Sequence, residues 1–217
     1  YEIGNIYIPK ALPLTELPDE RTQFTLGMYG DGDFFTMKGV VEEFFEKAGL
    51  DGRITYDPED KKSFLHPGRQ ADIIYDGVKV GYLGEVHPQV CENYNIGDRV
   101  YYADIDMPYI VEHACFDKKY EGIAKFPTST RDISLVVDKQ VLMGTMENAI
   151  IKKGGKLLES CELFDIYEGE QVGEGKKSVA FSLVFRAKDR TLSDTEISEI
   201  MDKILAELTG LGAVLRQ

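Results

Sequence analysis

The stretch RDISLVVDKQVLMGTMENAIIKKGGKLLESCELFDIY, residues 131–167, holds three patterns that decide the fold of the second half of the chain. Apolar and polar residues alternate over 131–138, which predicts a β-strand with one buried face. Residues 142–155 predict a helix that ends at a Gly-Gly pair, since glycine commonly follows the last helical turn. Alternation returns over 157–167 and predicts a second strand.

The elements that follow complete a βαββαβ order. A third strand is predicted over 177–187 and a short final one over 212–216. Between them, Ser193 and Glu196 have the spacing of a capping box at the start of a helix. One apolar stripe runs along this helix, formed by Ile197, Ile200, Met201, Ile204, Leu205 and Leu208. This order predicts a ferredoxin-like fold.

The first half predicts a second α+β region. Its firmest β-hairpin signal is the dipeptide Asp76-Gly77, which accepts positive φ at both central positions of a tight turn. A short helix is predicted from Met107, with Pro108 in its first turn. A longer helix is predicted over 36–49 from the spacing of Val40, Val41, Phe44, Phe45 and Ala48. Strands are predicted at 2–9, 23–30, 71–75, 78–86 and 99–107.

The composition is that of a packed globular protein whose 217 residues allow two domains. Cys91, Cys115 and Cys161 are odd in number and widely spaced, so they predict no disulfide framework and indicate a reducing compartment. No apolar run approaches the roughly 20 residues of a membrane span. The chain starts at Tyr1, without Met and inside an alternating pattern, which indicates a segment of a longer protein.

The net charge of −13 is unevenly distributed. Residues 1–124 carry 23 acidic and 12 basic side chains, a net charge of −11, whereas residues 125–217 carry 15 and 13, a net charge of −2. A surface that binds a polyanion therefore belongs to the second half, and there only as a local patch.

Several segments resemble a known family. KFPTSTRDISLVVD, the region from KKGG to FSLVFR, and RTLSDTEI resemble the C-terminal anticodon-binding domain of the bacterial phenylalanyl-tRNA synthetase beta chain. In the first half, YEIGNIY, DFFTMKGVVEEFFEKAGL, FLHPGRQADI and GYLGEVHPQV are similar to the segment that precedes it in that chain. The resemblance implies a partial class II synthetase-like antiparallel sheet with helices at 1–122, and a ferredoxin-like anticodon-binding domain at 123–217.

The resemblance also implies partners. In this family the alpha subunit carries out ATP-dependent aminoacylation of tRNA-Phe with phenylalanine, using Mg²⁺, in a cytoplasmic alpha2-beta2 heterotetramer. The residues predict no catalyst in this chain, because the strand over 2–9 runs into Pro9 and Lys10, where class II enzymes place an ATP-binding arginine. No segment of the GxGxxR kind follows. We therefore expect no catalytic residue, no metal ligand and no cofactor of the chain's own.

Two other kinds of site are weighed against the anticodon-binding interpretation, a metal site and a phosphate-binding loop. His66, His87 and Glu85 offer two imidazoles and a carboxylate that a metal ion accepts as ligands, although His-Pro at a strand end is more often a loop anchor. The loop over 168–177, EGEQVGEGKK, has glycines but neither of the phosphate-binding spacings, and no helix follows it. We interpret its glycines as turn residues.

Alternation within the strands predicts which residues leave the helix-covered face of the second sheet. Phe164 and Ile166 are expected to pack inward, together with a larger apolar set. That set is Ile133, Leu135, Val137, Val179, Phe181, Leu183 and Phe185. Ser134, Asp165, Tyr167 and Ser178 are then expected to share one uncovered surface.

Such a surface suits single-stranded RNA, whose bases stack on aromatic rings and bond to short polar groups. The resemblance implies that Tyr167 stacks on an anticodon base and that Asp165, Ser178 and Ser134 make polar contacts. Ser134 departs from the family, where alanine is expected. Arg131, Lys176, Lys177 and Arg186 are predicted as phosphate neighbours.

Two alternatives remain at this stage. A βαββαβ domain is also typical of regulatory modules that sense amino acids, and such a module would dimerise on ligand binding without affinity for RNA. The acidic first half is alternatively a structural module that presents a surface to a partner chain.

Overall fold

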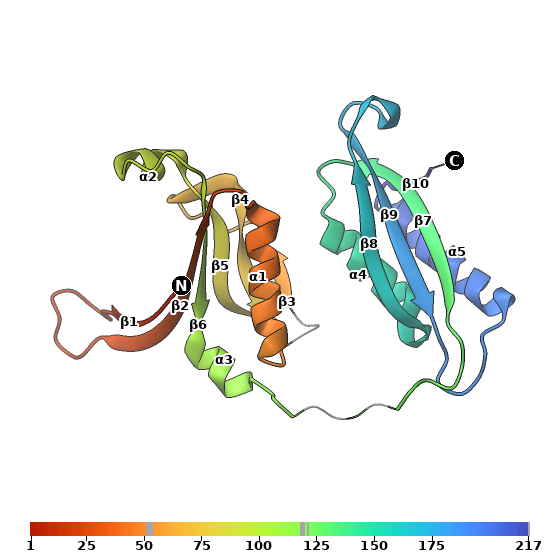
Figure 1. Cartoon of the computed structure of the whole chain (residues 1–217), viewed down its shortest axis with the longest axis horizontal. Coiled ribbons are helices and arrows are strands. Elements are labelled where there is room, and N and C mark those ends of the chain that lie inside the picture. The colour runs from red at the N-terminus through yellow and green to blue at the C-terminus, as the bar shows by residue number, and fades with distance from the viewer. Residues whose placement is uncertain (51–53, 118–119, 121, 217) are drawn as a thin grey trace. The chain divides into compact units, whose positions relative to one another are not determined.

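The computed structural model describes residues 1–50, 54–117, 120 and 122–216. They form two compact units, Tyr1–Lys119 (unit 1) and Tyr120–Gln217 (unit 2), and each is described by itself. Both units consist of an antiparallel sheet with helices packed on it, which confirms the predicted α+β class (Figure 1). None of the described helices is long and apolar enough to cross a membrane.

Unit 1 contains a six-stranded sheet in the order β1-β2-β6-β5-β4-β3. Helix α1, Phe34–Lys47, lies across one face of this sheet (Figure 1). It begins at a capping box between Asp33 and Thr36, in which each side chain accepts from the other's backbone N–H. The strands are β1 (Glu2–Ile8), β2 (Asp19–Tyr29), β3 (Ile54–Asp57), β4 (Leu65–Tyr75), β5 (Val78–Val86) and β6 (Val100–Asp106).

The helix stripe of α1 differs in one position from the prediction. Met37, Val41 and Phe45 are buried against the sheet, whereas Val40 is exposed. Positions four apart lie on the same side of a helix, so Met37 takes the place in the core that the sequence pattern assigned to Val40.

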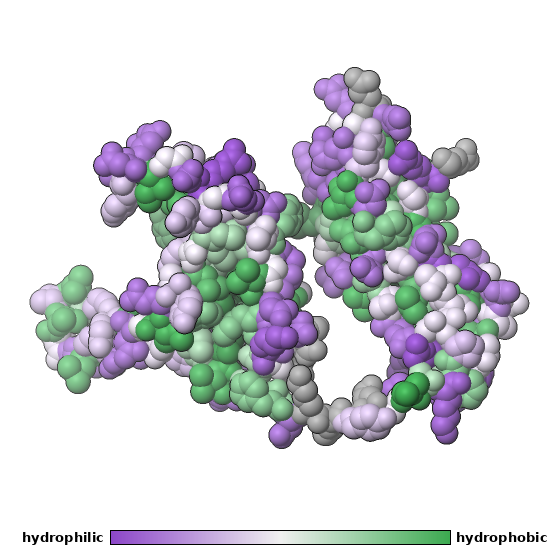
Figure 2. Space-filling view, viewed as in Figure 1, coloured by the Kyte–Doolittle hydropathy of each residue, from purple (hydrophilic) through white to green (hydrophobic). Residues whose placement is uncertain are grey.

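The turn between β4 and β5 is confirmed, because Asp76 and Gly77 both have positive φ, 49° and 81°. The short helix predicted at Pro108 is also present as α3, Met107–His113. Strand β3 and helix α2, Pro88–Asn93, were not predicted; both are too short to give a periodic pattern. The β1–β2 hairpin carries exposed apolar side chains at its far end, seen in Figure 2.

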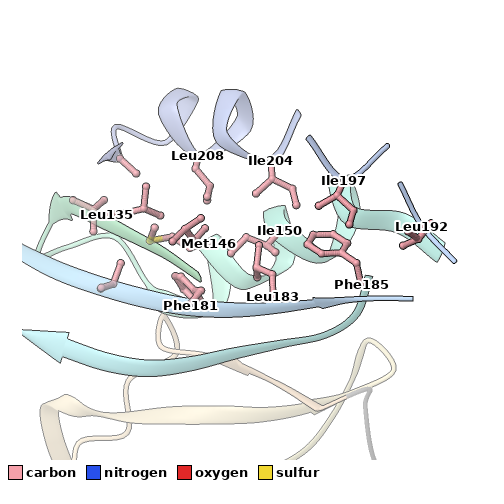
Figure 3. Close-up of a cluster of buried hydrophobic side chains, with 14 of the residues drawn as sticks. Leu135, Met146, Ile150, Phe181, Leu183, Phe185, Leu192, Ile197, Ile204 and Leu208 are labelled. Atoms are coloured by element: carbon pink, nitrogen blue, oxygen red, sulfur yellow. The ribbon is translucent and has the colours of Figure 1, made fainter. Parts of the chain in front are cut away.

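Unit 2 has the predicted βαββαβ order, with sheet order β10-β7-β9-β8 and every pair antiparallel. Both helices pack on one face of the sheet (Figures 1 and 3). The capping box at Ser193 and Glu196 is confirmed. The elements are β7 (Ser129–Asp138), α4 (Met143–Gly154), β8 (Leu158–Tyr167), β9 (Lys176–Phe185), α5 (Asp194–Gly210) and β10 (Val214–Leu215), with 3-10 turns at Gly155–Leu157 and Glu170–Val172.

The core of unit 2 lies between the sheet and its two helices. Phe181, Leu183 and Phe185 of β9 meet Met146 and Ile150 of α4 and the apolar stripe of α5, as Figure 3 shows. Each of these β9 side chains is fully buried, and burial of a phenylalanine or leucine contributes about 1.5 to 3 kcal/mol. The helices thus cover one sheet face and leave the other without a helix.

Candidate nucleic-acid interface

The candidate site is the face of the unit 2 sheet that points away from α4 and α5, called the open face below. Strand pairing defines it, because residues paired across strands share a face. Asp165 pairs with Ala180, which pairs in turn with Ser134, and these three form one row. In the next row Tyr167 pairs with Ser178. The four predicted contact residues therefore lie on one face.

Exposure within these rows is unequal. The Tyr167 side chain is 38% exposed, and Asp165 is exposed at the sheet edge. Neither side chain makes a hydrogen bond or ion pair with another residue that the structure describes. An aromatic ring and a carboxylate with free hydrogen-bonding capacity thus stand side by side on β8.

Ser178 corrects the prediction, because it lies on the open face but is only 3% exposed. Arg216, which follows β10 and was not predicted as a site residue, contacts Ser178. Its backbone N–H donates to the Ser134 carbonyl at 2.9 Å, and its Nη1 donates to Ser178 Oγ at 3.3 Å. The side chain of Arg216 therefore reaches across β7 to the Ser178 hydroxyl. Alternation along the chain puts the side chain of Arg216 on the same face as that of Val214. Only strand pairing shows that this face is the one on which Ser178 lies.

Strand β8 contains a second correction. Phe164 and Ile166 were expected to pack inward but are 56% and 48% exposed. Pairing advances from Leu163 to Asp165 on β8 while it advances by one residue on β9, so Phe164 is the extra residue of a β-bulge. Leu163 packs against the core instead, and Ile166 lies on the helix side at an edge that the helices leave partly uncovered.

Lys177, predicted as a phosphate neighbour, lies on the helix-covered face of the sheet. It pairs with Val137 on the helix-covered face, and its side chain is 9% exposed. Its Nζ donates to the carbonyls of Lys139 and Val141 at 3.0 and 2.8 Å. Burial lowers the pKa of this ammonium. Lys177 thus holds the connection between β7 and α4.

Arg131 and Arg186, also predicted as phosphate neighbours, lie away from Tyr167. Arg131 pairs with Leu183 on the helix side and donates to Asp194 at 2.8 Å. Arg186 lies beyond the other end of β9 and forms an ion pair with Glu159 at 3.0 Å. Eight residues of strand separate it from Ser178, roughly 27 Å.

The loop between β8 and β9 turns at Gly173 and Gly175, both with positive φ. A shallow depression of about 570 Å³ opens beside it. Lys139 and Glu168, which line it, form an ion pair at 2.8 Å, so its charges are of both signs and largely matched. Lys176, which stays at the Tyr167 end of the sheet, is exposed and also lines the depression.

The sheet of unit 1 also has a face that points away from helix α1, called the closed face below, and the polar side chains on it bind one another. Asp72, Tyr82, Asp104 and Thr25 form a row across four strands. Tyr82 Oη and Thr25 Oγ1 donate to the Asp104 carboxylate at 3.0 and 3.1 Å. The amino groups of Lys62 and Lys79 lie 2.7 and 2.6 Å from the two oxygens of Asp72.

The three residues of the alternative metal site, His66, His87 and Glu85, are hydrogen-bonded to other groups of the chain. The Glu85 carboxylate is bound by the guanidinium of Arg69 at 2.5 and 2.8 Å. The Nδ1 atoms of His66 and His87 accept from backbone N–H groups two residues on, those of Gly68 and Gln89. In the described part of the chain, no group of three or more His, Cys, Asp or Glu residues is arranged to hold a metal ion.

Comparison with known proteins follows the division into two units. The family model "Phenylalanyl tRNA synthetase beta chain CLM domain" matches residues 1–107, and "Ferredoxin-fold anticodon binding domain" matches residues 124–216. Across its whole length the chain is 45% identical to a phenylalanine–tRNA ligase beta subunit from Clostridium acetobutylicum. The chain belongs to this beta-subunit family. The predicted resemblance and the ferredoxin-like fold of the second unit are thereby confirmed.

Two further beta subunits of the family agree. Those of Clostridium tetani and Symbiobacterium thermophilum are 41% and 39% identical to this chain, again over its full length. The chain covers 27% of the Clostridium subunits and 25% of the Symbiobacterium subunit, so it spans about a quarter of its relatives.

Proposed function

We propose that the open face of unit 2 binds the anticodon region of tRNA-Phe. The observation that carries this proposal is Tyr167, a partly exposed ring on a helix-free sheet face, within a segment that matches an anticodon-binding family. The match to an anticodon-binding family supports RNA binding over the sensing of an amino acid, an alternative that the fold alone leaves open.

The chemistry of the face suits unstacked bases. A base stacks on Tyr167, which contributes roughly 1 to 3 kcal/mol. The Asp165 carboxylate accepts N–H groups from a base edge, and the Ser134 hydroxyl both donates and accepts. Lys176 supplies charge at the same end of the sheet.

The rest of the enzyme is proposed from the names of the relatives. A beta subunit implies an alpha subunit, and we assign to that subunit the ATP- and Mg²⁺-dependent transfer of phenylalanine to tRNA, in a cytoplasmic alpha2-beta2 assembly. This chain contributes no catalytic residue; it holds the tRNA by its anticodon so that the distant acceptor end reaches the alpha subunit.

A titration tests the RNA-binding role. The affinity of the 217-residue chain is measured for a tRNA-Phe anticodon stem-loop and for the same stem carrying a different anticodon. We expect the tRNA-Phe loop to bind at least about five-fold more tightly, since loss of a base contact costs about 1 to 3 kcal/mol. Equal affinities would contradict base recognition.

A further inference from the structure

Strand pairing and a backbone hydrogen bond set the position of Arg216 at the open face. Val214 pairs with Val136, and Leu215 pairs with Leu135 of the buried face. The Arg216 N–H then donates to the carbonyl of Ser134, which continues the ladder by one residue. Alternation places the Arg216 side chain on the same face as Val214, the open one.

The guanidinium of Arg216 lies close to the predicted stacking residue. Its Nη1 reaches Ser178 Oγ, and Ser178 is the direct partner of Tyr167 across β8 and β9. Paired side chains begin about 5 Å apart. Tyr167 and Arg216 thus both neighbour Ser178, Tyr167 by strand pairing and Arg216 by its hydrogen bond. We expect a nucleotide stacked on Tyr167 to bring its phosphate within reach of Arg216.

The charge of Arg216 is not neutralised by another described residue. Arg131, Arg186 and Lys139 each have a carboxylate partner within 3.0 Å. None of the ion pairs formed between described residues includes Arg216, whose one side-chain hydrogen bond goes to a neutral hydroxyl. A guanidinium has five N–H donors in a planar fork that fits phosphate oxygens, so four donors remain for a ligand.

We propose that Arg216 contacts the phosphate of the nucleotide that stacks on Tyr167. This assignment rests on the proposed function and extends it to a residue outside the four predicted contacts. When the guanidinium turns to the phosphate, the Ser178 hydroxyl loses its partner and becomes available to the RNA. In the free protein Ser178 is buried and accepts this hydrogen bond from Arg216.

The test compares the salt dependence of anticodon stem-loop binding for four chains: wild type, Arg216→Ala, Arg216→Gln and Lys203→Ala. Each phosphate contact on single-stranded RNA adds about 0.7 to the slope of log affinity against log salt. Both Arg216 variants are expected to lose this amount of slope and to bind roughly five-fold more weakly at 0.1 M salt. Lys203 is an exposed cation on α5, on the other side of the sheet, so its variant keeps the wild-type slope.

The outcomes separate the two proposals. Wild-type slopes in both Arg216 variants, with discrimination between anticodons intact, overturn the role of Arg216 and leave the proposed function standing. A wild-type chain that does not discriminate between anticodons overturns the proposed function itself. Arg216→Gln retains a hydrogen-bond donor for Ser178 without the charge, so it reports on charge even where the alanine variant is unstable.

Discussion

The two sheets of this chain each have one face covered by helices, and they differ in what occupies the other face. In unit 1 the acidic side chains of that face already have partners: Asp72 has two lysines, and Asp104 has two hydroxyls. In unit 2 Asp165 and Tyr167 have no such partner among the described residues, and Arg216 is bound only to a hydroxyl. The two faces thus differ in whether their central aspartates are already bound by other side chains of the same unit, a difference that net charge alone does not reveal.

The acidity of the chain is concentrated in its first half. Most of the −13 belongs to the first half, where several buried or partly buried carboxylates are neutralised by internal cations. Burial, together with the Asp104 carboxylate, raises the pKa of Tyr82, so this hydroxyl stays a neutral donor. RNA binding by unit 2 is therefore compatible with an acidic whole chain.

The largest expected effect comes from opening the closed face. Asp72→Ala removes the buried partner of Lys62, whose own side chain is only 15% exposed, and we expect unit 1 to lose about 3 kcal/mol of unfolding free energy. Asp60→Ala is the matched control, because Asp60 contacts the same two lysines from an exposed position and its loss should cost much less. Hydrogen exchange of the β4–β6 amides measures both. Equal losses would show that burial of the pair is unimportant.

The next effect concerns the open face. Tyr167→Ala should weaken binding of the tRNA-Phe anticodon stem-loop by about 2 kcal/mol, roughly 30-fold, because the stacking platform is lost. Tyr167→Phe keeps the ring and should bind nearly as the wild type does. Tyr94→Ala removes an exposed tyrosine of unit 1 and serves as control in the same titration. An unchanged affinity in Tyr167→Ala would rule out stacking.

Variants of two adjacent lysines of β9 test the difference between the helix-covered face and the open face of the unit 2 sheet. Lys177→Met removes two hydrogen bonds from an ammonium to carbonyls and should destabilise unit 2 by about 1 to 2 kcal/mol, without changing the salt slope of RNA binding. Lys176→Met should do the reverse, with a smaller slope and unchanged stability. Urea unfolding and salt titrations of both variants measure this, and exchanged phenotypes would place Lys177 on the RNA side.

The smallest effect is the pH dependence of the α5 cap. The Ser193 backbone N–H and the Arg190 guanidinium hold the pKa of Glu196 at about 2, below its ordinary 4.5. Because the folded pKa is lowered, this stabilisation is complete above about pH 4.5 and is lost as the pH falls through 2.

Glu196→Gln should therefore reduce the fall in Tm between pH 5 and pH 2, while Glu199→Gln, an exposed residue on the same helix, leaves it unchanged. Thermal unfolding monitored by circular dichroism across that range gives the comparison. RNA binding at neutral pH should be the same in both variants, because α5 lies on the covered face.

Local patterns were enough to predict the elements that carry the open face. Period-two alternation in β7 and β9, the capping box at Ser193 and the turn at Asp76-Gly77 depend on neighbouring residues only, and the structure has them as predicted. Lys177 could also have been placed correctly, since it shares its parity with Val179. Its charge suggested exposure, but hydrogen bonds to two carbonyls made burial possible.

What the sequence did not predict depends on contacts between distant segments. The bulge at Phe164 breaks the alternation of β8 and appears only when β8 is paired with β9. Ser178 is covered by a side chain 38 residues away, and the ion pairs of Asp72 join β4 to β5 and to the segment before β4. Pairing register, which one sequence does not reveal, decides all of these.

The most direct test of the central claim is to map the backbone amide chemical shifts of the whole chain by NMR as the tRNA-Phe anticodon stem-loop is added. We expect the largest changes at the open face, around Ser134, Asp165, Tyr167 and Ala180, with the face of Asp72 unchanged. Changes concentrated on unit 1 or on helices α4 and α5, or the absence of any change, would contradict it.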